Sequence, residues 1–189
     1  MRVVDSSLIT KVARQLSSPP AYAEVGVRGS VLTVAASSYG FGADVDELTQ
    51  PTGFDPEAAR LFEAIVESAF LVATADGHFD PAEQVAFQQV VLAGCGGFVG
   101  ERQVEALLLD LRDLLDEDGI DKRVEMVGRA VSKPEHAREV LRVAALLAHV
   151  SGGVSDVEQS VMKRLASRLG LDAAALDQAL GEAQTALNA

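Results

Sequence analysis

The chain has 189 residues and a mass of 19.9 kDa, the size of one compact domain. Its residues are 48% hydrophobic but only 5% aromatic, without Trp, so Ala, Leu and Val must fill the core. This composition favours packed helices over a β-sandwich or barrel and excludes a disordered chain. With 28 acidic and 16 basic residues the net charge is −12, which disfavours binding to nucleic acids or to an anionic membrane.

Cys95 is the only cysteine of the chain. The sequence therefore excludes an internal disulfide and a Cys-rich metal site, as is typical of a reducing compartment. No run of about 20 apolar residues is present, and the first residues lack the apolar region of a signal peptide. We therefore expect a cytoplasmic protein without a transmembrane segment.

Residues 1–54 are expected to form an N-terminal extension that is helical. Apolar residues recur at helical spacing over 6–16, and a Ser-Ser-Pro-Pro run ends that helix. The segment 25–42 is ambiguous because its β-branched residues also suit strands, but we favour a buried helix that ends at Gly40. Residues 44–52 then form a polar linker.

Residues 55–189 are expected to form the main helical domain. Asp-Pro pairs at 55–56 and 80–81 each start a helix, because Asp is a good N-cap and Pro suits the first turn. Asp121 is expected to cap a short helix, and Ser132 with Glu135 a capping box for the next one. The expected helices cover about 56–77, 81–94, 101–117, 121–131, 132–150, 156–169 and 172–187.

The main domain contains an internal repeat, over about 56–94 and 132–169. When the chain is shifted by 75 residues, six of the 23 positions in 69–91 are identical to those in 144–166. The matches include Gly77 with Gly152, Glu83 with Glu158 and Gln84 with Gln159. The sequence thus predicts an all-α helical bundle in which a duplicated helix-turn-helix unit packs about a pseudo-twofold axis.

The motifs ATADGHFDPAE (73–83) and AHVSGGVSDVE (148–158) resemble the TerB-like helical domain. That family includes the tellurite-resistance TerB proteins and the N-terminal part of DjlA-type co-chaperones. The resemblance covers about 55–189. It implies an all-helical fold, no enzymatic activity, and a scaffold role in tellurite resistance or a related stress response that is linked to metal ions through an acidic surface.

Three carboxylates, Asp76, Asp80 and Glu83, lie within eight residues of the first turn. If they converge, they offer the hard oxygen ligands that suit Ca²⁺ or Mg²⁺, although the spacing is not that of an EF-hand. Alternatively, Asp80 and Glu83 form a capping box and bind no metal. Ser155 and Glu158 repeat that box in the second copy without the Asp pair, which favours capping.

The densest acidic cluster lies at the end of one predicted helix. Its members are Asp110, Asp113, Asp116, Glu117, Asp118 and Asp121. Such a run usually forms only a solvated face, but it can also bind a basic protein partner.

The leading hypothesis is a non-enzymatic TerB-like scaffold whose acidic turn binds a divalent cation, Ca²⁺ or Mg²⁺. One alternative is a protein-interaction module without a metal. The other is an enzyme that uses Cys95 or a carboxylate pair in a pocket between helices. Nucleotide-binding motifs and the His pairs of zinc sites are absent from the sequence, so no other cofactor is expected.

Overall fold

The computed structural model describes residues 6–20, 23, 29–41, 55–150 and 154–188. Over these residues the chain forms nine α-helices and no strand, which confirms the all-α prediction. No helix in the described part of the chain is long and apolar enough to cross a membrane. The helices are α1 (Ser6–Ser17), α2 (Val31–Phe41), α3 (Pro56–Ala73), α4 (Pro81–Gly94), α5 (Glu101–Asp118), α6 (Ile120–Ala130), α7 (Pro134–Ala148), α8 (Asp156–Arg168) and α9 (Ala173–Asn188).

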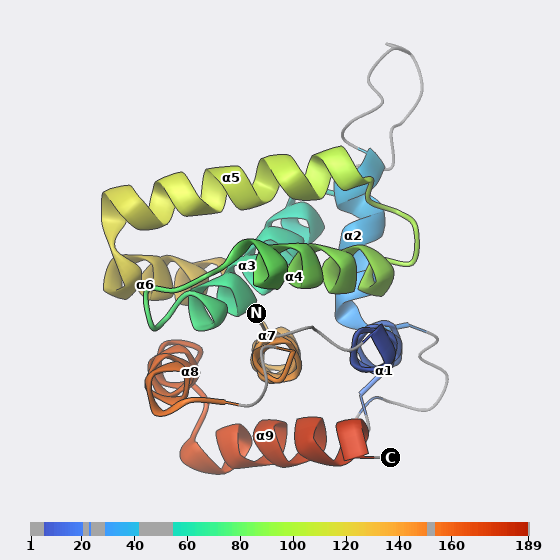
Figure 1. Cartoon of the computed structure of the whole chain (residues 1–189). Helices are drawn as coiled ribbons and strands as arrows, with labels where there is room; N and C mark the ends of the chain where they lie inside the picture. Colours follow the sequence, from blue (N-terminus) through green and yellow to red (C-terminus); the bar gives the residue numbers. More distant parts are fainter. Residues whose placement is uncertain (1–5, 21–22, 24–28, 42–54, 151–153, 189) are drawn as a thin grey trace.

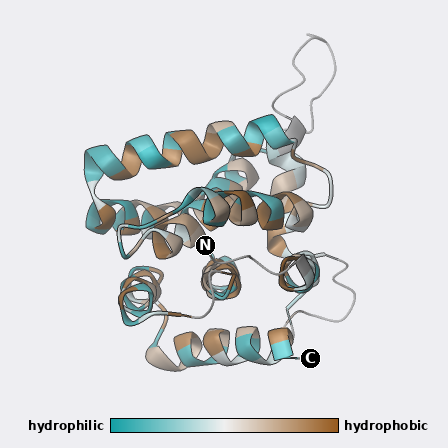
Figure 2. Ribbon diagram, viewed as in Figure 1, coloured by the Kyte–Doolittle hydropathy of each residue, from teal (hydrophilic) through white to brown (hydrophobic). Residues whose placement is uncertain are grey.

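Two helices, α3 and α7, form the centre of the molecule and pack against each other (Figure 1). Helices α2 and α6 flank α3, while α8 and α9 pack on α7. Helix α1 packs on α4 and also contacts α7 and α9. Helix α5 lies on the outside, over α3, α4 and α6, and Figure 2 shows hydrophilic and hydrophobic residues alternating along it.

The central helices are buried because they are apolar on nearly every side. Phe62, Ile65 and Phe70 of α3 and Leu141 and Leu146 of α7 are among the largest fully buried side chains. Val12 and Leu16 of α1 and Leu32 of α2 belong to the same core.

The two N-terminal helices therefore share their packing with the later ones. The division of the chain into an extension and a main domain at residue 55 stays a prediction. The linker expected over 44–52 lies outside the described residues.

Two of the predicted helix starts are wrong. Helix α7 begins at Pro134 with Lys133 as its N-cap residue, and Ser132 forms no capping box. A residue before Pro is forced into the extended region, so Lys133, at φ −100° and ψ 135°, cannot be helical. Helix α6 begins at Ile120, one residue before Asp121, because Gly119 at φ +75° joins it directly to α5.

The hairpins α3–α4 and α7–α8 carry the same hydrogen bonds at positions 75 residues apart. Near the end of the first helix, Thr74 Oγ1 donates to the Phe70 carbonyl over 2.8 Å, and the ring Nδ1 of His149 lies 2.7 Å from the Ala145 carbonyl. At the start of the second helix, both α4 and α8 have a complete capping box. Residues 151–153, in the second turn, lie outside the described residues.

Candidate functional site

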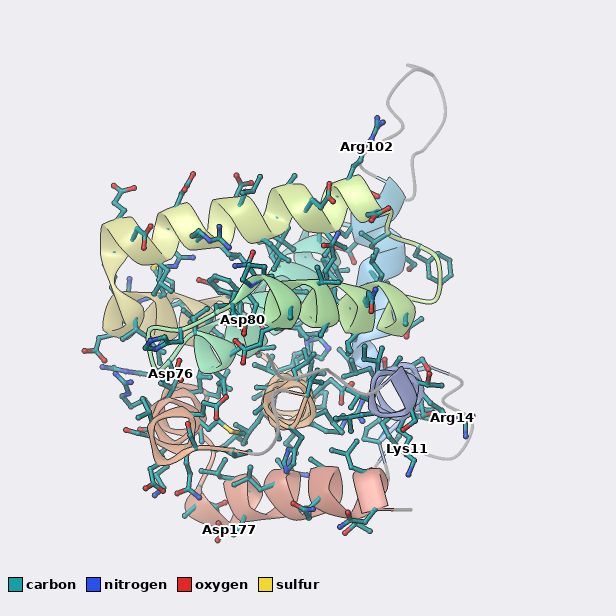
Figure 3. All side chains as sticks on the ribbon, in the orientation of Figure 1. Lys11, Arg14, Asp76, Asp80, Arg102 and Asp177 are labelled. Carbon is teal, nitrogen blue, oxygen red and sulfur yellow. The ribbon has the colours of Figure 1, made fainter. Side chains whose placement is uncertain are left out.

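The turn between α3 and α4 holds the three carboxylates predicted to bind a metal, and Figure 3 labels Asp76 and Asp80 there. Asp76 Oδ1 accepts a hydrogen bond from the His78 amide over 2.9 Å. Asp80 Oδ1 accepts from the amides of Ala82 and Glu83 over 2.7 and 2.9 Å. Glu83 Oε2 accepts from the Asp80 amide over 3.1 Å. Each carboxylate thus accepts a hydrogen bond from the backbone of its own turn.

The capping interpretation of this turn is confirmed, since Asp80 and Glu83 form both halves of the box. Gly77 adopts φ +78°, a conformation that favours Gly and lets the chain leave α3. Within the described residues, no group of three or more His, Cys, Asp or Glu side chains is placed to hold a metal ion. Metal binding by Asp76, Asp80 and Glu83 stays a prediction that this geometry does not favour.

The acidic cluster of α5 divides into an exposed part and a paired part. Asp110, Asp113, Asp116 and Glu117 are exposed, and none of the four forms an ion pair with another described residue. We call these four the acidic face of α5. Asp118, by contrast, has a side chain only 12% exposed and lies apart from this face.

Asp118 ties α5 to α6. Its two carboxylate oxygens accept hydrogen bonds from Lys122 Nζ over 2.6 Å and from Arg123 Nη1 over 3.1 Å. Arg123 in turn donates from Nε to Glu67 of α3 over 2.6 Å. The sequence predicted that Asp118 belongs to the docking surface, but its carboxylate forms ion pairs with Lys122 and Arg123 of the same chain. Asp121 likewise pairs with Arg164 of α8.

Two titratable groups near α5 have raised pKa values, mainly because they are buried and further because carboxylates lie near them. Burial raises the pKa of Glu63 above its ordinary value, and the charges of Glu67 and Asp110 raise it further, against the opposing effect of Arg60. Burial, followed by the charges of Glu63 and Asp110, also raises the pKa of Tyr39. The surface where α5 crosses α3 therefore has a negative potential, which attracts cationic groups.

A groove of about 230 Å³ lies between α4 and α5. Phe79, Leu108 and Leu109 provide its apolar wall, and Gln84 and Gln88 of α4 provide polar groups. Glu105 and Arg112 of α5 also line it, with one charge of each sign. The side-chain nitrogen of Gln88 is buried, and no described residue accepts a hydrogen bond from it. We call this feature the α4–α5 groove.

Leu109, which is 59% exposed, is not among the site residues predicted from the sequence. The run of three leucines at 107–109 could have indicated that one of them is exposed. Successive helical residues are about 100° apart, so three in a row cannot all face the core. Leu107 is buried, Leu108 is half-buried and Leu109 points outward.

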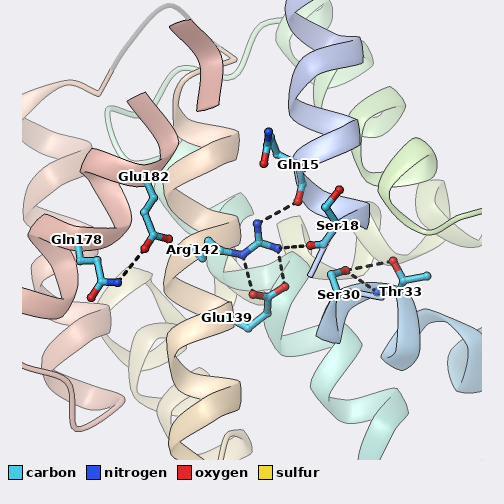
Figure 4. Close-up of polar contacts among 8 residues, drawn as sticks. All are labelled: Gln15, Ser18, Ser30, Thr33, Glu139, Arg142, Gln178 and Glu182. Atoms are coloured by element: carbon cyan, nitrogen blue, oxygen red, sulfur yellow. Dashed lines mark hydrogen bonds and ion pairs between the residues drawn. The ribbon is translucent and has the colours of Figure 1, made fainter. Parts of the chain in front are cut away.

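A second groove, of about 470 Å³, lies between α1, α7 and α9. Arg142 lines it, but Figure 4 shows this guanidinium held by Glu139, with Nε and Nη2 donating over 2.7 and 2.8 Å. Arg142 Nη1 also donates to the Gln15 carbonyl of α1 over 3.0 Å. The charge of Arg142 is therefore neutralised within the fold and stabilises the C-terminal end of α1.

The thiol of Cys95 is fully buried at the end of α4. Burial raises its pKa to about 12, so the thiol stays protonated at neutral pH. A buried, protonated thiol is a poor nucleophile. This geometry does not favour the hypothesis of an enzyme that uses Cys95, and the alternative of a carboxylate pair stays a prediction.

No family model, no curated protein and no solved structure matches the chain. The TerB-like resemblance therefore depends on the turn motifs alone.

Proposed function

We propose that the chain is a non-enzymatic scaffold of TerB-like architecture that binds a basic protein partner through the acidic face of α5. The hydrogen bonds repeated at a spacing of 75 residues support an origin of α3–α4 and α7–α8 by duplication. The cytoplasmic location expected from the single cysteine and the stress-response role implied by the resemblance belong to this proposal.

One observation carries the proposal, namely four exposed carboxylates on an outer helix that no described cation neutralises. Carboxylates three or four positions apart on a helix repel one another, as Asp113 does with Asp116 and Glu117. A partner that brings Lys or Arg side chains relieves this repulsion and is attracted by the same field.

The geometry favours the interaction module without a metal over the cation-binding scaffold. The carboxylates of the α3–α4 turn accept backbone hydrogen bonds, whereas those of the acidic face are exposed to solvent. The buried state of Cys95 supports the non-enzymatic part of the proposal.

The test compares two variants of the full chain with the same change in net charge. The first, Asp113→Asn, Asp116→Asn and Glu117→Gln, neutralises the acidic face. The second is the control and neutralises three exposed carboxylates of other helices, through Glu135→Gln, Asp156→Asn and Asp177→Asn.

Each variant is used as bait in lysates of the source cells at low and at high salt, and the captured proteins are identified by mass spectrometry. We expect basic partners that bind the wild type and the control at low salt and are lost with the first variant. Equal capture by both variants would contradict the proposal.

A further inference from the structure

We propose that the α4–α5 groove binds an amphipathic helix of net positive charge from another protein. This inference rests on the proposed function, and it adds the docking site and the chemistry that the partner presents.

The apolar part of the groove is open to a partner. Leu109 of α5, which lines the groove, is 59% exposed. Phe79 and Leu108 lie deeper and are packed against the core. An apolar side chain placed in the groove would cover Leu109 and remove apolar surface from water.

The groove also contains a buried donor. Gln84 uses its side-chain nitrogen to donate to the Phe79 carbonyl over 2.7 Å, but the corresponding nitrogen of Gln88 has no acceptor among the described residues. A buried donor without a partner costs free energy. The protein itself covers this nitrogen, so a bound segment contacts it only if the Gln88 side chain turns toward the groove.

The surrounding charge selects a basic segment. Helix α5 exposes six acidic side chains against two basic ones. The acidic residues are Glu101, Glu105, Asp110, Asp113, Asp116 and Glu117, and the basic ones are Arg102 and Arg112. Because α4 and α5 are antiparallel in Figure 1, the start of α4 with Asp80 lies beside the C-terminal half of α5. Of the charged side chains that line the groove itself, Glu105 is acidic and Arg112 is basic. The excess of negative charge comes from the other exposed carboxylates of α5 and from the start of α4, and it complements Lys and Arg at the rim of the groove.

A helix fits this site better than an extended strand or a nucleic acid. The groove lies between two packed helices, where a third helix can place residues at positions i, i+3, i+4 and i+7. The described residues form no sheet whose edge could pair with a strand. The negative potential opposes phosphate groups.

The test uses the full chain and two fluorescent synthetic peptides of identical Leu, Lys and Gln composition. In the first peptide the leucines form one helical face, and in the second their order is scrambled. Binding is measured by fluorescence anisotropy at low and at high salt. We expect the amphipathic peptide to bind about tenfold more tightly than the scrambled one, since only the first can bury leucines in the groove.

Two matched variants locate the site. Leu109→Gln removes an exposed apolar side chain of the groove, and Val157→Gln removes one that is 47% exposed on α8. Both positions are exposed, so both variants should fold, which circular dichroism verifies. We expect Leu109→Gln to weaken the amphipathic peptide about tenfold and Val157→Gln to leave it unchanged. In nuclear magnetic resonance spectra, the side-chain amide signals of Gln88 should shift with this peptide.

The failures of the two proposals are distinguishable. If both peptides bind equally and Leu109→Gln has no effect, the groove inference is overturned, while salt-dependent binding still supports an acidic docking surface. If neither peptide binds at low salt, the groove inference is overturned and the acidic docking surface loses its support as well.

Discussion

The hairpins α3–α4 and α7–α8 have the same hydrogen bonds between side chains and backbone at their turns but different surroundings. The second helix of one, α8, packs on α6 so closely that Gly128 touches Arg168. The second helix of the other, α4, packs on α1 and leaves the α4–α5 groove on its other side. The second helix of one hairpin is thus covered by α6, whereas the second helix of the other borders a groove.

The two hairpins show which property of the N-cap residue matters for the start of the second helix. Each second helix needs a side-chain oxygen at its N-cap, and Asp80 and Ser155 both supply it. The negative charge of Asp80 is not needed for this purpose, because a neutral hydroxyl performs it in the other hairpin. An acidic turn is therefore weak support for a metal site.

The central helices also differ in the sign of one buried charge. Glu67 of α3 and Arg142 of α7 lie 75 positions apart and are both buried. Glu67 is paired with Arg123 of α6, and Arg142 with Glu139 of its own helix. Each charge has an ionic partner, as burial requires.

The largest effect should come from breaking the Arg142 pair. Glu139 is fully buried, so Glu139→Ala leaves Arg142 without its carboxylate and should lower the free energy of unfolding by about 3–5 kcal/mol. Glu67→Ala should cost less, because Arg123 keeps its contact with Asp118. Urea unfolding followed by circular dichroism measures both values.

A double variant controls for the loss of packing. Glu139→Leu combined with Arg142→Leu removes both charges and should cost less than Glu139→Ala alone, since no unpaired charge stays buried. If Glu139→Ala lowers the free energy of unfolding no more than Glu67→Ala does, Arg142 does not depend on Glu139 more than Arg123 depends on Glu67.

The next effect concerns the close packing of the second hairpin. A Cβ atom at Gly128 would lie 2.9 Å from the main-chain oxygen of Arg168, so Gly128→Ala must push α6 and α8 apart. We expect a loss of about 1–3 kcal/mol in the free energy of unfolding. Gly181→Ala in α9 is the control, because its Cβ meets open space and Ala favours a helix by about 1 kcal/mol. Thermal unfolding should show Tm changes of opposite sign, and a stabilising Gly128→Ala would contradict the packing argument.

Local patterns in the sequence predicted most of the fold. The Asp-Pro pairs at the starts of α3 and α4 and the Ser155 cap of α8 are found as expected, since each depends on residues a few positions apart. The start of α7 was missed because the restriction that Pro134 places on Lys133 outweighs the capping preference of Ser132.

The candidate site was harder to predict because it depends on contacts between distant residues. The sequence does not show that Arg123 approaches Asp118 and Glu67 together, and so it assigned Asp118 to the docking surface. The α4–α5 groove likewise requires knowing which face of α5 packs on α4. Only the orientation of Leu109 could have been inferred, from the three consecutive leucines.

The capping boxes predict equal and moderate effects in the two hairpins. Asp80→Ala and Ser155→Ala each remove the oxygen that accepts from the first turn, and each should lower the free energy of unfolding by about 1 kcal/mol. The measurement is repeated with excess Ca²⁺ and with a chelator. If Asp80 only caps α4, Ca²⁺ leaves both values unchanged, whereas a stabilisation by Ca²⁺ that Asp80→Ala abolishes would restore the metal hypothesis.

The smallest effect is a pH dependence that separates Asp118 from the acidic face. Hydrogen bonds from Lys122 and Arg123 hold the pKa of Asp118 below its ordinary value of 3.8. The unfolded carboxyl therefore takes up its proton at a higher pH than the folded one, so the stabilising contribution is present above about pH 4 and is lost as the pH falls further. Asp118→Asn should lower the Tm at neutral pH and make the fall in Tm between about pH 5 and about pH 3 less steep.

Asp113→Asn, on the same helix and without an ion pair among the described residues, is the control and should not lower the Tm at neutral pH. If the two variants behave equally, the ion pairs of Asp118 do not stabilise the fold. Asp118 would then be as available to a partner as the residues of the acidic face.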